Sequence, residues 1–254
     1  MVGEKEINLL FICGSPHSGT SLLLSIFGST PGVTALTNET GLLKKMSVQE
    51  FRSQLPRLPQ PTKLVVEKTP AHVFALEKIC CDPQSKALIT VRNPVDVVAS
   101  MRKRGIALNE AIDTYYSFNK EWLRFESSDS IYVQRYEDLT ENPRRCLKKL
   151  SEQFGLNLIT GNATRLDSQQ IYFSGHGLGP VPGELTDGLG HRNHLALRNH
   201  QMKQPIKRMN GEWRGRITKE ELSLTLSKLR PIILTLGYHE CFDYPATFDA
   251  CDPQ

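Results

Sequence analysis

A short stretch rich in glycine and hydroxyl side chains, Gly14 to Ser21, has the residue types that can hold a phosphate group. It reads Gly-Ser-Pro-His-Ser-Gly-Thr-Ser. An apolar run over residues 7–13 precedes it and apolar residues at helical spacing follow it, which predicts a buried strand, a tight loop and a helix. Backbone N–H groups and the positive end of the helix dipole meet at such a loop and can bind an anion. The alternative is a tight turn that needs its glycines only for backbone reasons.

The positions of Gly14, Gly19 and Ser21 fit the nucleotide-binding frame G-x-x-x-x-G-K-[ST], with one departure. Thr20 stands where that frame has the lysine that reaches the β- and γ-phosphates. ATP or GTP chemistry is therefore disfavoured while anion binding is retained, and a P-loop kinase or NTPase is kept as the alternative function.

A second pair of anion-binding side chains, Arg92 and Ser100, is separated by eight residues. Residues 86–91 predict a core strand that delivers Arg92 to the edge of the sheet, and Asn93 caps the helix that follows. We expect this helix to run to about Arg104 and to carry Ser100 and Arg104 on one face. A guanidinium and a hydroxyl across such a turn can hold one oxyanion. The alternative is a capped helix with a solvated cationic end.

These two segments resemble the motifs of the sulfotransferases that use 3′-phosphoadenosine 5′-phosphosulfate. The family's loop reads Pro-Lys/Arg-Ser-Gly-Thr-Thr/Ser, and the matching residues here are Pro16, His17, Ser18, Gly19, Thr20 and Ser21. The family's Arg and Ser, eight residues apart, bind the 3′-phosphate of the cofactor, which implies that role for Arg92 and Ser100, with Arg104 beside them. His17 departs from the family's permanent cation and can replace it only when protonated, or by donating one neutral N–H.

Three later segments resemble the family in the expected order. Residues 67–70, Glu-Lys-Thr-Pro, resemble the third-strand motif whose lysine, here Lys68, faces the transferring sulfuryl group. Tyr136 begins a segment that resembles the one whose tyrosine lies by the cofactor. Residues 198–206 and 211–214 resemble the family's late loop that closes over the nucleotide, which implies a phosphate contact from Lys203. The resemblance covers about residues 7–238, and it implies a cofactor converted to adenosine 3′,5′-bisphosphate without a metal.

Two residues, Glu39 and His72, are candidates for the base that takes the acceptor's proton. A short strand at residues 33–36 places Glu39 at the carboxyl edge of the sheet. Relatives that sulfate carbohydrates or tyrosyl proteins resemble this chain in having a glutamate after the second strand, whereas those that sulfate phenols and steroids use a histidine after the third. We expect Glu39 to be the base, ahead of His72. Lys68, the loop N–H groups and a protonated His17 would stabilise the leaving phosphate. A non-catalytic relative that only binds the nucleotide is a third possibility, which His17 favours.

Strands followed repeatedly by helices predict an α/β fold, with a central parallel sheet flanked by helices as in the P-loop-like sulfotransferases. We expect a single domain over residues 1–254, with its core at about 7–238, a long loop at about 158–212 and a tail at 239–254. The expected strands are 7–13, 33–36, 63–67, 86–91 and 131–133, and the later helices are 94–104, 107–126, 143–154 and one that begins with a capping box of Thr218 and Glu221.

The composition is that of a soluble globular protein: of 254 residues, 39% are hydrophobic and 23% are charged, with a net charge of +4. This mild positive charge favours a small anionic ligand over nucleic acid. A signal-peptide pattern and a membrane-spanning stretch are both missing, so we expect a cytoplasmic protein without a membrane partner. Its expected partner is a hydroxyl acceptor, which is a sugar, a small molecule or a peptide tyrosine.

The histidines and cysteines give no zinc pattern. His191 and His194 have the spacing of a metal pair, but no carboxylate-rich shell accompanies them, so we expect solvated histidines. Cys241 and Cys251 can form a disulfide in an oxidising compartment, and the sequence leaves this open.

Overall fold

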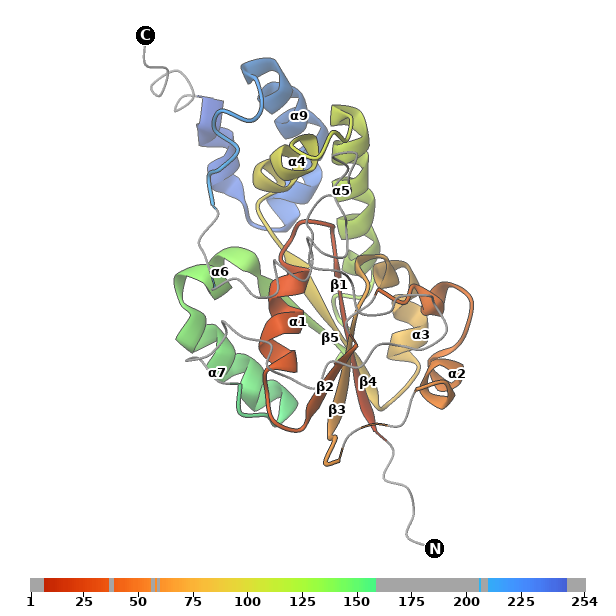
Figure 1. The fold of residues 1–254 in the computed structure, drawn as a ribbon. Helices are drawn as coiled ribbons and strands as arrows, with labels where there is room; N and C mark the ends of the chain where they lie inside the picture. The colour runs from red at the N-terminus through yellow and green to blue at the C-terminus, as the bar shows by residue number, and fades with distance from the viewer. Residues whose placement is uncertain are drawn as a thin grey trace, which may run out of the picture.

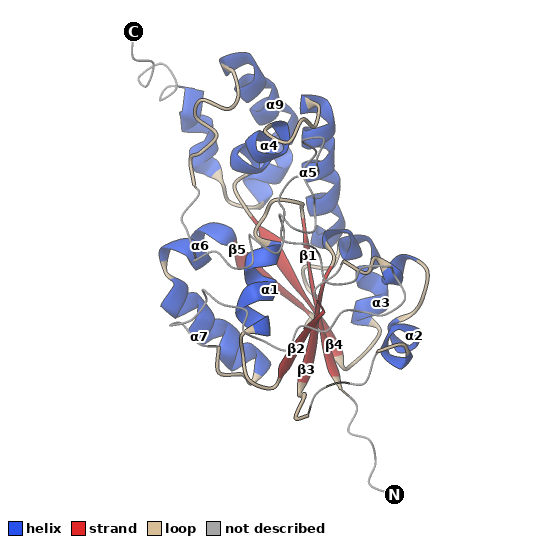
Figure 2. Cartoon of the chain, in the orientation of Figure 1, coloured by secondary structure: helices blue, strands red, loops and turns tan. Residues whose placement is uncertain are grey.

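Five parallel strands form one sheet in the computed structural model, which describes residues 7–36, 39–55, 58, 60–158, 206 and 210–245. The strand order is β2-β3-β1-β4-β5, and Figure 2 shows the sheet as the central layer of the fold. The strands are β1 (Asn8–Gly14), β2 (Val33–Leu36), β3 (Leu64–Lys68), β4 (Ser85–Val91) and β5 (Ile131–Arg135). Because every pairing is parallel, the carboxyl ends of all five strands meet at one edge.

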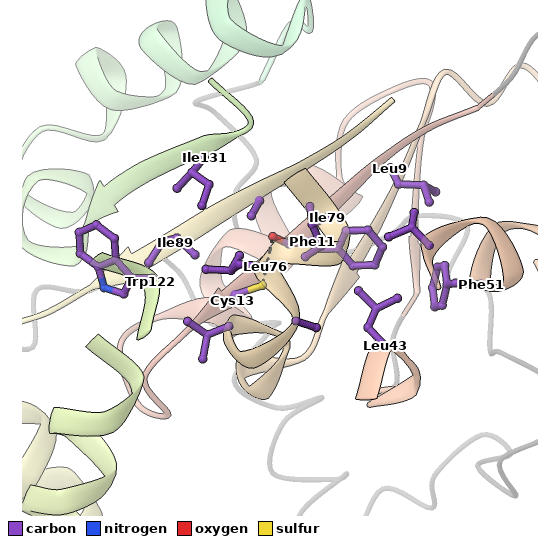
Figure 3. Close-up of a cluster of buried hydrophobic side chains, with 14 of the residues drawn as sticks. Leu9, Phe11, Cys13, Leu43, Phe51, Leu76, Ile79, Ile89, Trp122 and Ile131 are labelled. Carbon is purple, nitrogen blue, oxygen red and sulfur yellow. Dashed lines mark hydrogen bonds between the residues drawn. The ribbon is translucent and has the colours of Figure 1, made fainter. Parts of the chain in front are cut away.

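β1 lies at the centre, and its side chains alternate between two hydrophobic clusters. Leu9, Phe11 and Cys13 belong to one cluster, and Leu10 and Ile12 belong to the other. All five side chains are at most 2% exposed, which explains why this strand is apolar throughout rather than alternating. Figure 3 shows the first cluster, where the ring of Phe11 lies among side chains from the helices that cover that face.

Helices cover both faces of the sheet, as Figure 1 shows. On one face, α1 (Thr20–Gly28), α6 (Tyr136–Glu141) and α7 (Pro143–Phe154) pack against the cluster that contains Leu10. The opposite face is covered by η1 (Leu42–Lys44), α2 (Val48–Ser53), η2 (Pro70–Ala75) and α3 (Leu76–Cys80), together with side chains from the C-terminal half of α5 (Leu108–Leu123). The result is the three-layer arrangement that the alternation of strands and helices predicts.

A third cluster joins helices that gather at one end of the molecule (Figure 1). They are α4 (Pro94–Arg102), α5, α9 (Lys219–Thr235) and η3 (His239–Asp243). The first residue before α9, Thr218, forms the expected capping box with Glu221. Because α4 directly follows β4, this cluster supports the segment that carries Arg92 and Ser100.

The expected α/β fold is confirmed, and the ends of all five strands lie within two residues of the predicted ones. Two expectations are corrected. α4 ends at Arg102, so Arg104 lies in an exposed turn rather than on the helix, and Gly105 follows it with a φ of 84°. The region expected to be a tail instead begins with η3, whose Cys241 is fully buried in the third cluster.

Several other expectations fall outside the described residues. They concern most of the long loop at 158–212, together with Lys203, His191, His194 and Cys251. The thiol of Cys241 is free. None of the helices in the described part of the chain has the length and apolar character needed to cross a membrane.

Candidate active site

The loop between β1 and α1 lies at the carboxyl edge of the sheet and is held there by close contacts at two glycines. Gly14 and Gly19 have φ values of 132° and 103°, which other residues rarely adopt. A Cβ on Gly14 would lie 2.4 Å from the carbonyl oxygen of Thr90, and a Cβ on Gly19 would lie 2.6 Å from Cδ2 of Tyr136. Both glycines are therefore required by neighbours as well as by backbone conformation.

The N-terminus of α1 has neither a side-chain cap nor an acidic neighbour. Its N-cap is Gly19, which has no side chain to cap the helix, and no acidic residue lies in the first turn. Ser18 is buried beside it, and its hydroxyl group donates to the carbonyl oxygen of Ser15 at 2.7 Å and lies 2.5 Å from the hydroxyl of Thr90. The contact with Thr90 joins the loop to β4. Of the other loop residues, Thr20 is buried, while Pro16, His17 and Ser21 are partly exposed.

Arg92 follows β4 directly and lies against the same loop. Its Nη1 donates to the carbonyl oxygen of His17 at 3.2 Å, and its guanidinium carbon lies 4.5 Å from the centre of the Tyr136 ring. The hydroxyl of Tyr115 on α5 donates to the backbone carbonyl of Arg92 at 2.7 Å. Arg92 is only 8% exposed, so its charge is held in place by the loop, by Tyr136 and by α5.

His17 and Ser100 meet, although they are 83 residues apart in the sequence. Nδ1 of His17 lies 2.8 Å from Oγ of Ser100. Ser100 lies on α4, which Asn93 caps by accepting hydrogen bonds from two N–H groups of the first turn. The loop and the segment from Arg92 to Ser100 are therefore in direct contact at both ends of that segment. Arg104 lies beyond the end of α4, in the exposed turn.

Asp96 is a buried carboxylate that the sequence placed only on a helix. It accepts hydrogen bonds from the backbone N–H of Gly211 at 2.9 Å and of Trp213 at 3.3 Å. Burial raises the pKa of Asp96, and the charge of Arg92 and these two donors offset part of that rise. The segment after the long loop is thus attached to the helix that carries Ser100. The sequence carried no signal for this burial, because Asp96 has the helical spacing of Ser100 and Arg104 rather than that of the apolar residues of the helix.

Glu39 and Lys68 meet at the other half of the sheet edge. β2 and β3 pair in parallel with Leu36 opposite Glu67, so the chain leaves both strands at the same point. The ammonium group of Lys68 donates to Oε1 of Glu39. The side chain of Lys68 is 3% exposed and that of Glu39 is 31% exposed. A carboxylate that solvent can reach is thereby held beside a buried cation, and a carboxylate in such a place can accept a proton from a bound hydroxyl group.

His72, the other candidate base, has no exposed surface. Its Nδ1 lies 3.0 Å from Oε2 of Glu67, and its Nε2 accepts the backbone N–H of Leu43 at 3.4 Å. Phe11 packs edge-on against the ring, with ring centroids 5.7 Å apart. Both ring nitrogens of His72 thus face groups of the protein itself.

Glu67, which the sequence showed only as the neighbour of Lys68, is buried at the centre of a polar network. Its Oε1 accepts hydrogen bonds from the N–H and the hydroxyl of Thr40, both at 3.1 Å, and from the hydroxyl of Thr69. Burial alone raises the pKa of Glu67, but His72 and these donors lower it overall. Two adjacent charges at the end of an apolar strand were the signal, because neighbouring side chains point to opposite faces of the sheet and both faces are covered.

Comparisons with known proteins agree on one family. Residues 8–176 match a family model described as "Sulfotransferase domain", whereas no curated protein sequence matches the chain. The structure of the sulfotransferase domain from the curacin biosynthetic pathway is similar, with a TM-score of 0.56 and 19% identity over 89% of this chain and 99% of that chain. Mouse sulfotransferase SULT7A1 complexed with PAP has a TM-score of 0.52 and 17% identity, over 89% and 85%. These structural similarities show a shared fold.

Proposed function

This chain belongs to the sulfotransferase family, and from that premise we propose that it transfers a sulfuryl group from 3′-phosphoadenosine 5′-phosphosulfate to a hydroxyl acceptor, with Glu39 as general base. The observation that carries the proposal is the contact between Glu39 and Lys68 at the sheet edge that also holds the phosphate loop. In the register of the sheet, Lys68 lies opposite Ile12, two residues before the loop begins at Gly14.

The residues at this edge fit the two anionic ends of the cofactor. The N-terminus of α1, which no side chain caps and where Gly19 leaves no room for a Cβ, would hold the 5′-phosphosulfate. Arg92, Ser100 and, from the turn beyond α4, Arg104 would hold the 3′-phosphate, and we keep Lys203 as a further phosphate contact. Tyr136 contacts both Gly19 and Arg92 and would border the nucleotide. The cofactor supplies the electrophilic sulfuryl group, and no metal is part of the proposal.

The residues of the chain then divide the proton and the charge between them. Glu39 takes the proton of the acceptor hydroxyl as its oxygen forms the new bond to sulfur. Lys68 and the N–H groups at the start of α1 stabilise the negative charge left on the phosphate oxygen as the old bond to sulfur breaks. A protonated His17 adds to this stabilisation, and its contact with Ser100 would couple the two phosphate sites.

Exposure and bonding partners support Glu39 over His72 as the base. A base must come within hydrogen-bond reach of the proton that it takes. The carboxylate of Glu39 is 31% exposed at the sheet edge, while His72 has no exposed surface and its Nε2 accepts a backbone hydrogen bond. A glutamate base also supports an acceptor of the sugar or tyrosyl-peptide class. The relatives that this chain resembles in having a glutamate after the second strand sulfate carbohydrates or tyrosyl proteins.

Calorimetric titration separates this proposal from a P-loop kinase or NTPase. We expect adenosine 3′,5′-bisphosphate to bind tightly, and equally well with and without magnesium, because Thr20 replaces the lysine that ATP chemistry requires. A preference for Mg-ATP would contradict the sulfotransferase proposal.

The acceptor is identified by screening alcohols, phenols, sugars and tyrosyl peptides with sulfur-labelled cofactor. Transfer to a sugar or a tyrosyl peptide is the expected result. If the protein binds adenosine 3′,5′-bisphosphate but transfers label to no member of the panel, it is a nucleotide-binding relative without turnover, and the proposed catalytic function is wrong.

A further inference from the structure

The four backbone N–H groups that follow Glu39 in the sequence each donate to a side chain. The N–H of Thr40 donates to Oε1 of Glu67, that of Gly41 to Oγ1 of Thr69 at 3.3 Å, that of Leu42 to Oγ1 of Thr40 at 3.4 Å, and that of Leu43 to Nε2 of His72 at 3.4 Å. Three of the four acceptors come from residues 67–72, where β3 ends and η2 begins. The segment after Glu39 is therefore fixed by side chains rather than by a strand partner.

The protons of these side chains form a consistent set. Because Nε2 of His72 accepts from Leu43, the ring proton lies on Nδ1, which faces Oε2 of Glu67 at 3.0 Å. The hydroxyl of Thr69 donates to Glu67 and accepts from Gly41, and the hydroxyl of Thr40 donates to Glu67 and accepts from Leu42. Each hydroxyl thus uses both its donor and its acceptor capacity. Glu67, at 1% exposure, accepts from both hydroxyls through Oε1, while its Oε2 lies 3.0 Å from Nδ1 of His72.

We propose that Glu67, Thr69 and His72 are positioning residues that hold residues 40–43 and thereby keep the Glu39 carboxylate on Lys68. The inference rests on the proposed function, since it assigns the catalytic step to Glu39. Lys68 is the last residue of β3 and lies between Glu67 and Thr69 in the sequence. The end of β3 therefore contacts the side chain of Glu39 through Lys68 and holds the backbone after Glu39 through Glu67 and Thr69. His72, the competing base by sequence, acts here as an acceptor for Leu43.

A pair of variants at Thr69 tests this inference. Thr69→Val removes the hydroxyl at nearly constant shape, so Gly41 loses its acceptor and Glu67 loses a donor. Thr69→Ser keeps the hydroxyl and is the matched control. With the fastest acceptor of the panel, we expect Thr69→Val to lower kcat by about 10- to 100-fold, because small misplacements of a catalytic group have effects of that size. Thr69→Ser should stay close to the wild type, and both should bind adenosine 3′,5′-bisphosphate as the wild type does.

A double-mutant cycle with Glu39→Gln separates positioning from general loss of structure. If Thr69 acts through Glu39, Thr69→Val should have almost no further effect on kcat once Glu39 is glutamine. If Thr69→Val lowers kcat by the same factor in both backgrounds, the positioning role is wrong. Thr34→Val is a further control, because the Thr34 hydroxyl in β2 lies 2.9 Å from that of Thr62, two residues before β3 begins, and so belongs to the opposite end of β3 from Thr69. It should lower stability without changing kcat.

Amide hydrogen exchange gives a readout that needs no acceptor. The N–H groups of residues 40–43 should exchange about tenfold faster in Thr69→Val than in the wild type or in Thr34→Val, because a hydrogen bond that protects them is lost. Unchanged exchange in this segment would overturn the inference. A Glu39→Gln variant with normal turnover would instead overturn the base assignment of the proposed function, and the exchange result would still judge whether the network holds this segment.

Discussion

Donors gather at the ends of β1 and β4, where the N-terminus of α1 has no side-chain cap, the guanidinium of Arg92 lies against the loop, and the Ser100 hydroxyl contacts His17. At the ends of β2 and β3, by contrast, the carboxylates of Glu39 and Glu67 accept bonds from donors of the same chain. From their proposed roles, we call the first region the nucleotide side and the second the acceptor side. A surface of donors suits an anionic ligand that binds and leaves. A carboxylate held by several bonds suits a base that must stay in one place through each turnover.

The largest expected effect is on the acceptor side, at Glu39. Glu39→Gln is nearly isosteric and removes the basicity, so we expect turnover to fall by about two to four orders of magnitude. The affinity for adenosine 3′,5′-bisphosphate should change little, because Glu39 lies outside the nucleotide side. Steady-state kinetics and calorimetric titration of the same preparation measure both quantities.

The competing assignment has its own outcome. His72→Ala removes the acceptor of the Leu43 N–H and should lower turnover through loss of position, and it should also reduce the thermal stability. If Glu39→Gln turns over normally while His72→Ala abolishes turnover and leaves the fold intact, His72 is the base. The expected acceptor class would then shift to phenols.

The next largest effect is on the nucleotide side, at Arg92. Charge-assisted hydrogen bonds contribute about 1.5–3 kcal/mol each, so Arg92→Ala should weaken the binding of adenosine 3′,5′-bisphosphate by about one to two orders of magnitude. Unlike Glu39→Gln, it should leave most of kcat at saturating cofactor. An unchanged dissociation constant would mean that the 3′-phosphate binds elsewhere.

The two sides also differ in how well the sequence predicted them. The phosphate loop is contiguous, and a buried strand followed by glycines and a helix has a local signature, so its place at the sheet edge could be predicted. The meeting of Glu39 with Lys68 could be expected from two strands that end at one edge. The roles of these residues in binding and catalysis stay predictions.

What the sequence did not reveal depends on contacts between distant segments. Glu67 bonds to Thr40, which is 27 residues away, and His17 meets Ser100 across 83 residues. Neither contact can be predicted from the spacing of its residues in the sequence, because it depends on the strand register and on how the helices pack. The early end of α4 was missed for a local reason: Gly105, with its positive φ, terminates the turn just after Arg104.

A smaller effect is expected at Gly19, where the loop touches Tyr136. Gly19→Ala combines a strained backbone with a Cβ placed 2.6 Å from the ring, and we expect it to lower the free energy of unfolding by about 1–3 kcal/mol. Gly155→Ala is the matched control, because Gly155 also has a positive φ but has no atom within 4 Å of its added Cβ. Chemical denaturation measures both changes, and equal losses of stability would show that neither the Tyr136 contact nor the larger φ of Gly19, 103° against 61°, adds to the cost.

The smallest effect is on stability in acid, where Glu67 on the acceptor side and Asp96 beside Arg92 on the nucleotide side should act in opposite directions. The reason is that the pKa values of these two buried carboxyl groups are shifted in opposite directions. The pKa of Glu67 is lowered in the folded state, so below an unfolded value of about 4.3 the unfolded chain binds more protons and the Glu67 contribution to stability falls with pH. The pKa of Asp96 is raised, so the folded state binds the proton first, and stability rises as pH falls toward the unfolded value of about 3.9.

Substitution of each carboxyl group by its amide should therefore change the acid limb of the stability curve in opposite directions. We expect Glu67→Gln to make the loss of stability below about pH 4.3 shallower, and Asp96→Asn to make the loss of stability over acidic pH steeper, relative to the wild type. Urea unfolding at several pH values between neutral and acidic measures the slopes, so the overall stability lost in either variant does not affect the comparison. Slopes that change in the same direction would show that the pKa shifts of the two carboxyl groups have the same sign. The contrast between the nucleotide side and the acceptor side would then be wrong at these two residues.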